Sequence, residues 1–389
     1  MTHVVIIGGG TAGLPTAYEL AELARAGERI TVVANRATFR SAAASAWITA
    51  QGSTEFDLAQ NLRRRGIGFS AAGARRLHPE RNQLELGDGQ VLDYDYLVLA
   101  AGPRPAFEEI EGLGPHGGYT HSLCHADHLA GCVRDWNRFL ADPGPVIVGA
   151  VQGASCFAPA YESAFLMEQE LRARKLRERA PMTFVTAEPY IGHLGVGGIA
   201  DSRARLEAAL RERDIGWIAG ARVERVERGT MHVSENGAGG KRHALAFRYS
   251  MMMPPFRGIE AVAGIEGLAD ARGFILIDRF LRNPKYRNIY AAGVTVASAA
   301  ASATSVATEP HKSAYAIESM VSAVVRNIRD EIDGKRAGAG AEWNPVHLAD
   351  LGASGLAFVA GPASLHPTHG VDAGDWVHLS RCSACDAGD

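Results

Sequence analysis

The sequence predicts an α/β fold with two tandem Rossmann-like dinucleotide-binding domains and a short C-terminal segment. Three observations predict it: short β-branched apolar runs end in glycine turns at four places, helical patterns follow these turns, and strands alternate with helices along the chain. The length of 389 residues suits two or three domains. We expect doubly wound, largely parallel sheets.

The composition excludes several classes of protein. Hydrophobic residues make up 47% of the chain and charged residues 21%, which is a globular rather than a disordered balance. The net charge of −3 argues against a nucleic-acid partner. Apolar runs stay below the roughly 18 residues of a membrane-spanning helix, and the N-terminus lacks a signal-peptide pattern. Five scattered cysteines do not suit a disulfide scaffold, so we expect a reducing, cytoplasmic location.

The first glycine turn lies at the very start of the chain. A predicted strand at residues 4–7 leads into Gly8-Gly9-Gly10-Thr11-Ala12-Gly13, a helical pattern follows, and a second predicted strand spans residues 30–33. Such glycines let the backbone approach a pyrophosphate, and the helix N-terminus supplies N–H donors. The candidate cofactor contacts in this unit are Gly8, Gly10, Thr11, Ala12, Gly13, Asn35 and Arg36. Asn35 stands where an acidic ribose ligand is usual, and its amide could still bind a ribose hydroxyl.

Two shorter motifs identify the dinucleotide. Predicted strands at residues 96–100 and 288–291 end in Ala101-Gly102 and in Gly293. This pair of motifs accompanies FAD in chains with two tandem nucleotide folds. We therefore expect FAD in a discontinuous first domain, residues 1–112 and 270–335, with Ala101, Gly102 and Gly293 among its contacts.

The second glycine turn, in a domain expected at residues 113–269, is altered. It reads Gly149-x-Val151-x-x-Ala154, and a valine at the central position would crowd a pyrophosphate. This argues against a tight NAD(P)H site. Cys156 follows instead, near a helix N-terminus whose dipole lowers the pKa of a thiol. Glu162 lies six residues further on and could exchange protons with a sulfur substrate. The alternative interpretation is a small buried cysteine.

With these motifs the chain resembles the sulfide:quinone oxidoreductases, over almost its whole length. The related flavocytochrome c sulfide dehydrogenases share the architecture but are exported. The segments that carry the resemblance are residues 146–162, 188–195 and 251–256, Lys312 with residues 316–323, and residues 343–352.

The resemblance implies a two-electron oxidation of sulfide by a cysteine pair over FAD, with a membrane quinone as the electron acceptor. Cys156 and Cys124 match the cysteine pair, and His128 and His193 match histidines near the sulfide entry. Lys312, at the start of the last long helical pattern, would stabilise negative charge on the reduced flavin.

The chain departs from the family pattern at its C-terminal segment, residues 336–389. His347 stands in the segment where the family has a third cysteine, and an imidazole cannot form a disulfide. The family continues past Leu379 into amphipathic helices that contact the membrane, whereas this chain ends ten residues later. The departure argues against the family's mode of membrane attachment, so any membrane contact would be peripheral and without these helices. A homo-oligomer is compatible with the sequence. Cys382 and Cys385 form a dithiol motif that could replace the missing partner of Cys156.

Two other functions stay open from the sequence. The first is a flavoenzyme that uses NAD(P)H to reduce a quinone or a disulfide. The second is a flavoprotein that senses sulfide or redox state without turnover, which the substitution at His347 favours. Reduction of the flavin by sulfide, and transfer of its electrons to a quinone, would distinguish both from the sulfide:quinone oxidoreductase reaction.

Overall fold

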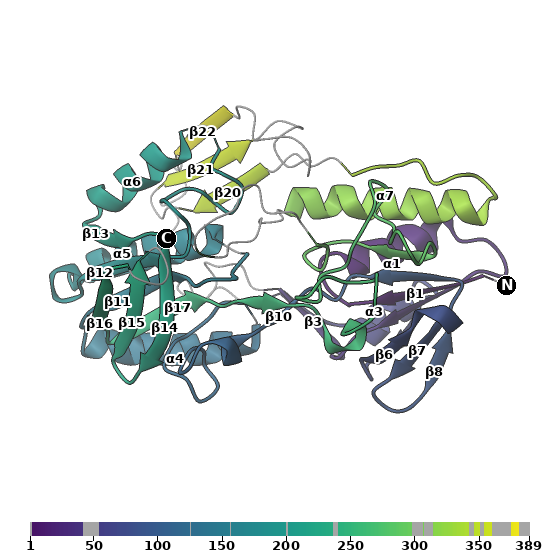
Figure 1. Ribbon diagram of the computed structural model, residues 1–389, viewed down its shortest axis with the longest axis horizontal. Coiled ribbons are helices and arrows are strands. Elements are labelled where there is room, and N and C mark those ends of the chain that lie inside the picture. Colours follow the sequence, from purple (N-terminus) through teal and green to yellow (C-terminus); the bar gives the residue numbers. More distant parts are fainter. Residues whose placement is uncertain are drawn as a thin grey trace, which may run out of the picture.

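The computed structural model describes residues 2–41, 54–124, 126–155, 157–199, 201–235, 240–297, 306, 314–341, 346–350, 354–359 and 375–380. Two α/β halves lie side by side along the long axis of the molecule (Figure 1). This confirms the predicted fold class. The domain boundaries expected from the sequence stay a prediction.

The first half is built on a parallel sheet of five strands in the order β19-β9-β1-β2-β5. Its strands are β1 (His3–Ile7), β2 (Arg29–Val33), β5 (Gly68–Ser70), β9 (Tyr96–Leu99) and β19 (Ile289–Ala291). Helices α1 (Gly13–Leu23) and α7 (Ala314–Ile332) pack together over this sheet (Figure 1), and α3 (Leu58–Arg63) precedes β5. The central strands are fully buried because both faces of the sheet are covered.

Two antiparallel units extend the first half. One is the ribbon of β3 (Thr38–Ser41) and β4 (Thr54–Asp57), and the other is the sheet of β6 (Ala74–His78), β7 (Gln83–Leu86) and β8 (Val91–Asp93). Short 3-10 helices span Pro79–Arg81, Phe107–Glu109, Arg177–Arg179 and Glu260–Val262.

The second half repeats the Rossmann plan with a parallel sheet of four strands in the order β13-β12-β11-β17. These are β11 (Val146–Ala150), β12 (Met182–Thr186), β13 (Ile215–Ile218) and β17 (Tyr249–Met253), and the helices of this half are α4 (Ala126–Ala141), α5 (Ala158–Ala173) and α6 (Ser202–Glu212). An antiparallel sheet of β14 (Ala221–Glu227), β15 (Thr230–Glu235) and β16 (Arg242–Ala246) packs on it through a separate apolar cluster.

The halves are joined by a short antiparallel pair, β10 (Arg104–Pro105) and β18 (Phe256–Arg257), which lies between them in Figure 1. The C-terminal segment forms a third antiparallel sheet of β20 (Val346–Asp350), β21 (Ser354–Val359) and β22 (Asp375–Ser380). β20 lies against α5 and also reaches α7. Among the described residues, every helix is too short or too polar to span a bilayer.

Candidate functional site

The turn after β1 is shaped by close backbone packing on one side and open space on the other. A Cβ at Gly8, whose φ is +127°, would lie 2.2 Å from the carbonyl oxygen of Ala100, and a Cβ at Gly13 would lie 1.9 Å from the carbonyl oxygen of Gly8. A Cβ at Gly10 would meet nothing within 4 Å. The turn therefore packs tightly on the sheet while Gly10 faces an open cradle at the N-terminus of α1.

This cradle lies where the strand order of the first sheet reverses. β1 lies between β2 on one side and β9 on the other. Ligands of doubly wound sheets bind where the strand order reverses in this way. Gly293, with a φ of +86°, brings the turn after β19 to the same place, since a Cβ there would lie 2.9 Å from Cβ of Ala12. The glycines thus leave room for the pyrophosphate of a dinucleotide such as FAD, and the N–H groups of α1 point to it.

The remaining predicted cofactor residues surround the same end of the sheet. Thr11, Ala101 and Asn35 are exposed, and Gly102 has a φ of +68°. The guanidinium of Arg36 forms an ion pair with Asp127 of α4, 2.8 Å away, and so links the two halves. Lys312 lies outside the described residues.

The corresponding turn after β11 is filled by protein. Val151 is fully buried in the apolar cluster that joins the second Rossmann sheet to β14 and β15. The amide of Gln152 bridges the backbone of Val223, donating to its carbonyl at 2.8 Å and accepting from its N–H at 3.0 Å. These side chains occupy the place where a pyrophosphate would approach, which supports the sequence argument against an NAD(P)H site.

The predicted sulfur site, around Cys124 and Cys156, lies at the carboxyl ends of three neighbouring parallel strands of the second sheet. Ala150 of β11 is paired with Thr186 of β12 and with Met253 of β17. The thiol of Cys124, half-buried, lies 3.8 Å from the sulfur of Met253. Cys156 follows β11 but lies outside the described residues, and Glu162 is half-buried on α5. His347 is described by its backbone alone, paired with Phe358, in the strand that lies against α5.

Glu188, which was not among the predicted site residues, organises the loop after β12. Its side chain is fully buried and accepts hydrogen bonds from the Tyr161 hydroxyl (2.8 Å), the Thr186 hydroxyl (2.8 Å) and the Leu194 N–H (2.7 Å). Burial raises the pKa of Glu188 to about 7, against the opposing effect of these donors. An acidic residue after the second strand of a βαβ unit is a usual ribose ligand, so the position of Glu188 after β12 could have marked it in the sequence as a candidate site residue. Here the carboxylate is turned inward.

The same network holds the backbone on both sides of His193. The Gly192 N–H donates to the Tyr161 hydroxyl at 2.9 Å, while the Leu194 N–H donates to Glu188. The His193 side chain is 2% exposed, and neither ring nitrogen has a hydrogen-bond partner among the described residues. Burial lowers its pKa, so the imidazole is neutral near pH 7. The imidazole is therefore neutral, and the backbone on both sides of it is held in place by the Glu188 network.

His128, in the first turn of α4, is a second buried histidine close to Cys124 in the chain. It is 8% exposed and lies against the ring of Phe107, with ring centroids 5.7 Å apart. Cys132, one turn further along α4, is fully buried, and burial raises the pKa of its thiol to about 11. A thiol with that pKa stays protonated and unreactive near neutral pH.

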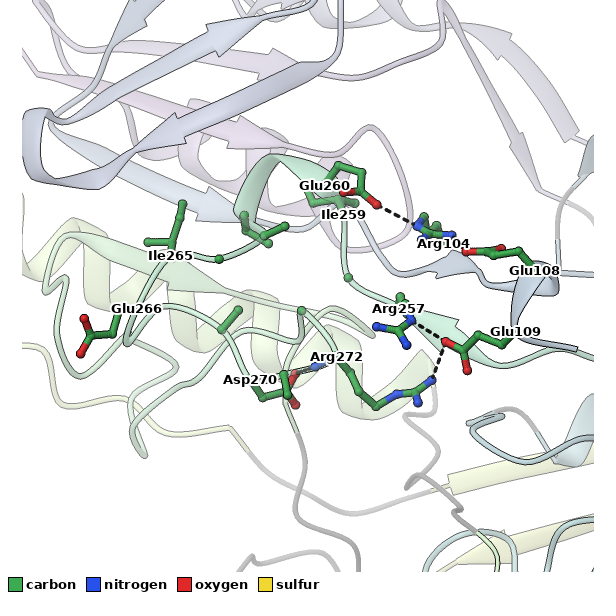
Figure 2. Close-up of a pocket in the computed structure, with 17 residues that line it drawn as sticks. Arg104, Glu108, Glu109, Arg257, Ile259, Glu260, Ile265, Glu266, Asp270 and Arg272 are labelled. Atoms are coloured by element: carbon green, nitrogen blue, oxygen red, sulfur yellow. Dashed lines mark hydrogen bonds and ion pairs between the residues drawn. The ribbon is translucent and has the colours of Figure 1, made fainter. Parts of the chain in front are cut away.

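A cavity of about 670 Å³ lies beside the β10–β18 pair (Figure 2). Its arginines are all ion-paired, because Arg104 pairs with Glu108 and Glu260, and Glu109 pairs with Arg257 and Arg272. The carboxylates of Glu266 and Asp270 also line it. Of the predicted site residues that the structure describes, none lines this cavity. We assign it no part in the chemistry.

Comparison with known proteins places this site in a family. Residues 2–309 match the pyridine nucleotide-disulphide oxidoreductases. A sulfide-quinone reductase from Aquifex aeolicus (strain VF5) is 34% identical over 388 residues, covering 97% of this chain and 88% of the relative. The chain belongs to the sulfide:quinone oxidoreductase family. Its members use a flavin, so the protein is a flavin-dependent oxidoreductase, and the resemblance expected from the sequence is confirmed.

Two further comparisons agree with this family. The crystal structure of the sulfide:quinone oxidoreductase from Aquifex aeolicus superposes with a TM-score of 0.90 at 33% identity, covering 97% of this chain and 87% of that one. A mitochondrial sulfide:quinone oxidoreductase from Schizosaccharomyces pombe is 24% identical over 229 residues, covering 56% of this chain and 48% of the relative. The individual roles of the predicted site residues stay predictions.

Proposed function

We propose that the protein is an FAD-dependent sulfide:quinone oxidoreductase. The 34% identity to a sulfide-quinone reductase across 97% of the chain carries this proposal. In the reaction, H₂S loses two electrons and two protons and leaves sulfur at oxidation state zero, and a quinone takes up two electrons and two protons to become a quinol. The quinone would be reached by peripheral contact with a membrane from the cytoplasmic side.

FAD, when bound, would accept the electron pair from the sulfur centre and deliver it to the quinone. The open cradle at Gly10 and the tight turns at Gly8 and Gly13 fit its pyrophosphate. Ala101, Gly102 and Gly293 would line the same groove, and Lys312 would offset negative charge on the reduced ring. Val151 and Gln152, packed into the second turn, speak against NAD(P)H as the electron donor.

The sulfur chemistry would take place at the carboxyl ends of β11 and β17. Sulfide would attack a sulfur bridge between Cys156 and Cys124, forming a persulfide on one cysteine and releasing the other as a thiolate. Cys124 lies beside Met253, and the electron pair that FAD accepts would come from this reduced sulfur centre. Glu162 would exchange protons with the bound sulfur. His193, neutral and buried, is suited to take a proton from H₂S, and the buried His128, which follows Cys124 in the chain, would serve the same purpose. His347 would contribute an imidazole where the family has a third cysteine.

In the experiment, sulfide is added anaerobically to the FAD-loaded protein, and the visible absorbance of the flavin is measured. We expect the band to bleach in wild type and to persist in Cys156→Ala. Cys132→Ala is the matched control, because that thiol is buried and protonated, and it should bleach like wild type. An unbleached wild type, full bleaching in Cys156→Ala, or rapid bleaching by NADH alone would refute the proposal.

A further inference from the structure

Two histidines from different segments meet at the start of α4. The Nε2 atom of His116 lies 3.2 Å from Nε2 of His128, and their rings meet edge-on with centroids 5.0 Å apart. His116 is exposed in the loop between the 3-10 helix Phe107–Glu109 and α4, whereas His128 is 8% exposed. One imidazole of the pair therefore reaches water while the other is buried.

A contact between two imidazole nitrogens holds one proton, because one nitrogen must donate and the other accept. Histidine also exchanges protons readily near neutral pH, so such a pair can pass a proton along its axis. The surroundings of His128 leave His116 as the group that connects it to water. Phe107 packs against His128, and the neighbouring carboxylate of Asp127 is already ion-paired with Arg36 and Arg40.

We propose that His116 relays protons between the buried His128 and water during sulfide oxidation. This rests on the proposed function, in which each H₂S oxidised releases two protons at the site. His128 takes up one proton and becomes an imidazolium, its Nε2–H passes to the lone pair on Nε2 of His116, and His116 releases its Nδ1–H to water. Both rings are then neutral again with their tautomers exchanged, and the electrons leave separately through the flavin.

The test uses full-length, FAD-loaded His116→Ala in stopped-flow reduction by sulfide under anaerobic, weakly buffered conditions. We expect flavin reduction to slow about tenfold or more, since a lost proton-transfer group typically costs at least that much. Added imidazole, a small proton carrier, should restore the rate in the variant and leave wild type unchanged. His78→Ala is the matched control, because the side chain of this histidine also reaches water (38% exposed) but lies on β6 in the other half. It should behave as wild type.

The outcomes separate the relay from the function on which it rests. A wild-type rate in His116→Ala, or a slow rate that imidazole does not restore, would overturn the relay alone. A wild type that sulfide does not reduce would overturn the proposed function and the relay with it. If His116→Ala loses FAD, His116→Gln is measured in its place, because it keeps a planar polar side chain but has no titratable proton. Imidazole should restore its rate too, and failure to do so would overturn the relay.

Discussion

The hydroxyl of Tyr161 lies 2.8 Å from Oε2 of Glu188 and joins α5 to the loop that carries His193. α5 begins just after the position of Cys156, so this bond connects the two segments to which we assign the sulfur chemistry. Tyr161 also accepts the Gly192 N–H at 2.9 Å. The relative position of these segments thus depends on one buried phenol and one buried carboxylate.

Removing the Tyr161 hydroxyl should loosen this connection. Tyr161→Phe leaves the Gly192 N–H and one lone pair of Glu188 without a partner, so we expect a loss of about 1–3 kcal/mol in the free energy of unfolding. Reduction of the flavin by sulfide should slow because His193 is no longer fixed, whereas FAD content should not change. Urea denaturation and stopped-flow absorbance measure the two effects.

The control for this variant is Tyr315→Phe, whose ring on α7 is 46% exposed. Its hydroxyl removal should leave both stability and rate near wild type. An equal loss in the two variants, or an unchanged rate in Tyr161→Phe, would contradict the assigned connection.

Glu188 should make stability depend on pH. Because burial raises its pKa to about 7, the folded protein holds a proton that the unfolded chain, with the ordinary lower pKa, releases. Its contribution is therefore present at low pH and is lost as the pH rises through about 7. Between about pH 5 and about pH 8 we expect wild type to lose about 2 kcal/mol relative to Glu188→Gln, which cannot titrate. Urea denaturation of both proteins at the two pH values measures this difference, and a difference that does not change with pH would contradict the buried, titrating carboxyl.

Two glycines of the first turn should respond differently to the same methyl group. In Gly13→Ala the Cβ would lie 1.9 Å from the carbonyl of Gly8, so both folding and FAD binding should be lost or strongly reduced. In Gly10→Ala the Cβ meets only open space, so stability should stay within about 1 kcal/mol of wild type. That open space is the expected pyrophosphate site, and FAD affinity should fall. Thermal unfolding of the apoprotein and FAD titration measure the two properties. Unchanged FAD affinity in Gly10→Ala would contradict the placement of the cofactor.

The sequence predicted the fold because its signals are local. A strand, a glycine turn and a helix are adjacent in the chain at Gly8 and at Gly149, and the structure has strands and helices at both places. Gly293 could be placed from its motif, although its contact with Ala12 joins residues that are far apart in the sequence.

The parts that the sequence did not predict depend on tertiary contacts. Glu188 follows a strand like a ribose ligand, and its inward turn depends on Tyr161, in a different element. The pairing of His116 with His128 likewise joins an irregular loop to a helix, and no periodic pattern marks it. The hydrogen bonds of the Gln152 amide to the backbone of Val223 require the β14–β15–β16 sheet, which the sequence analysis did not anticipate.

The most direct measurement of the central claim is quinol formation from a short-chain quinone analogue, with sulfide as the sole reductant and the FAD-loaded protein as catalyst. The account predicts one quinol for each sulfide oxidised, and loss of this turnover in Cys156→Ala. Quinol formation that requires NADH and ignores sulfide, or sulfide consumption without any quinol, would contradict it.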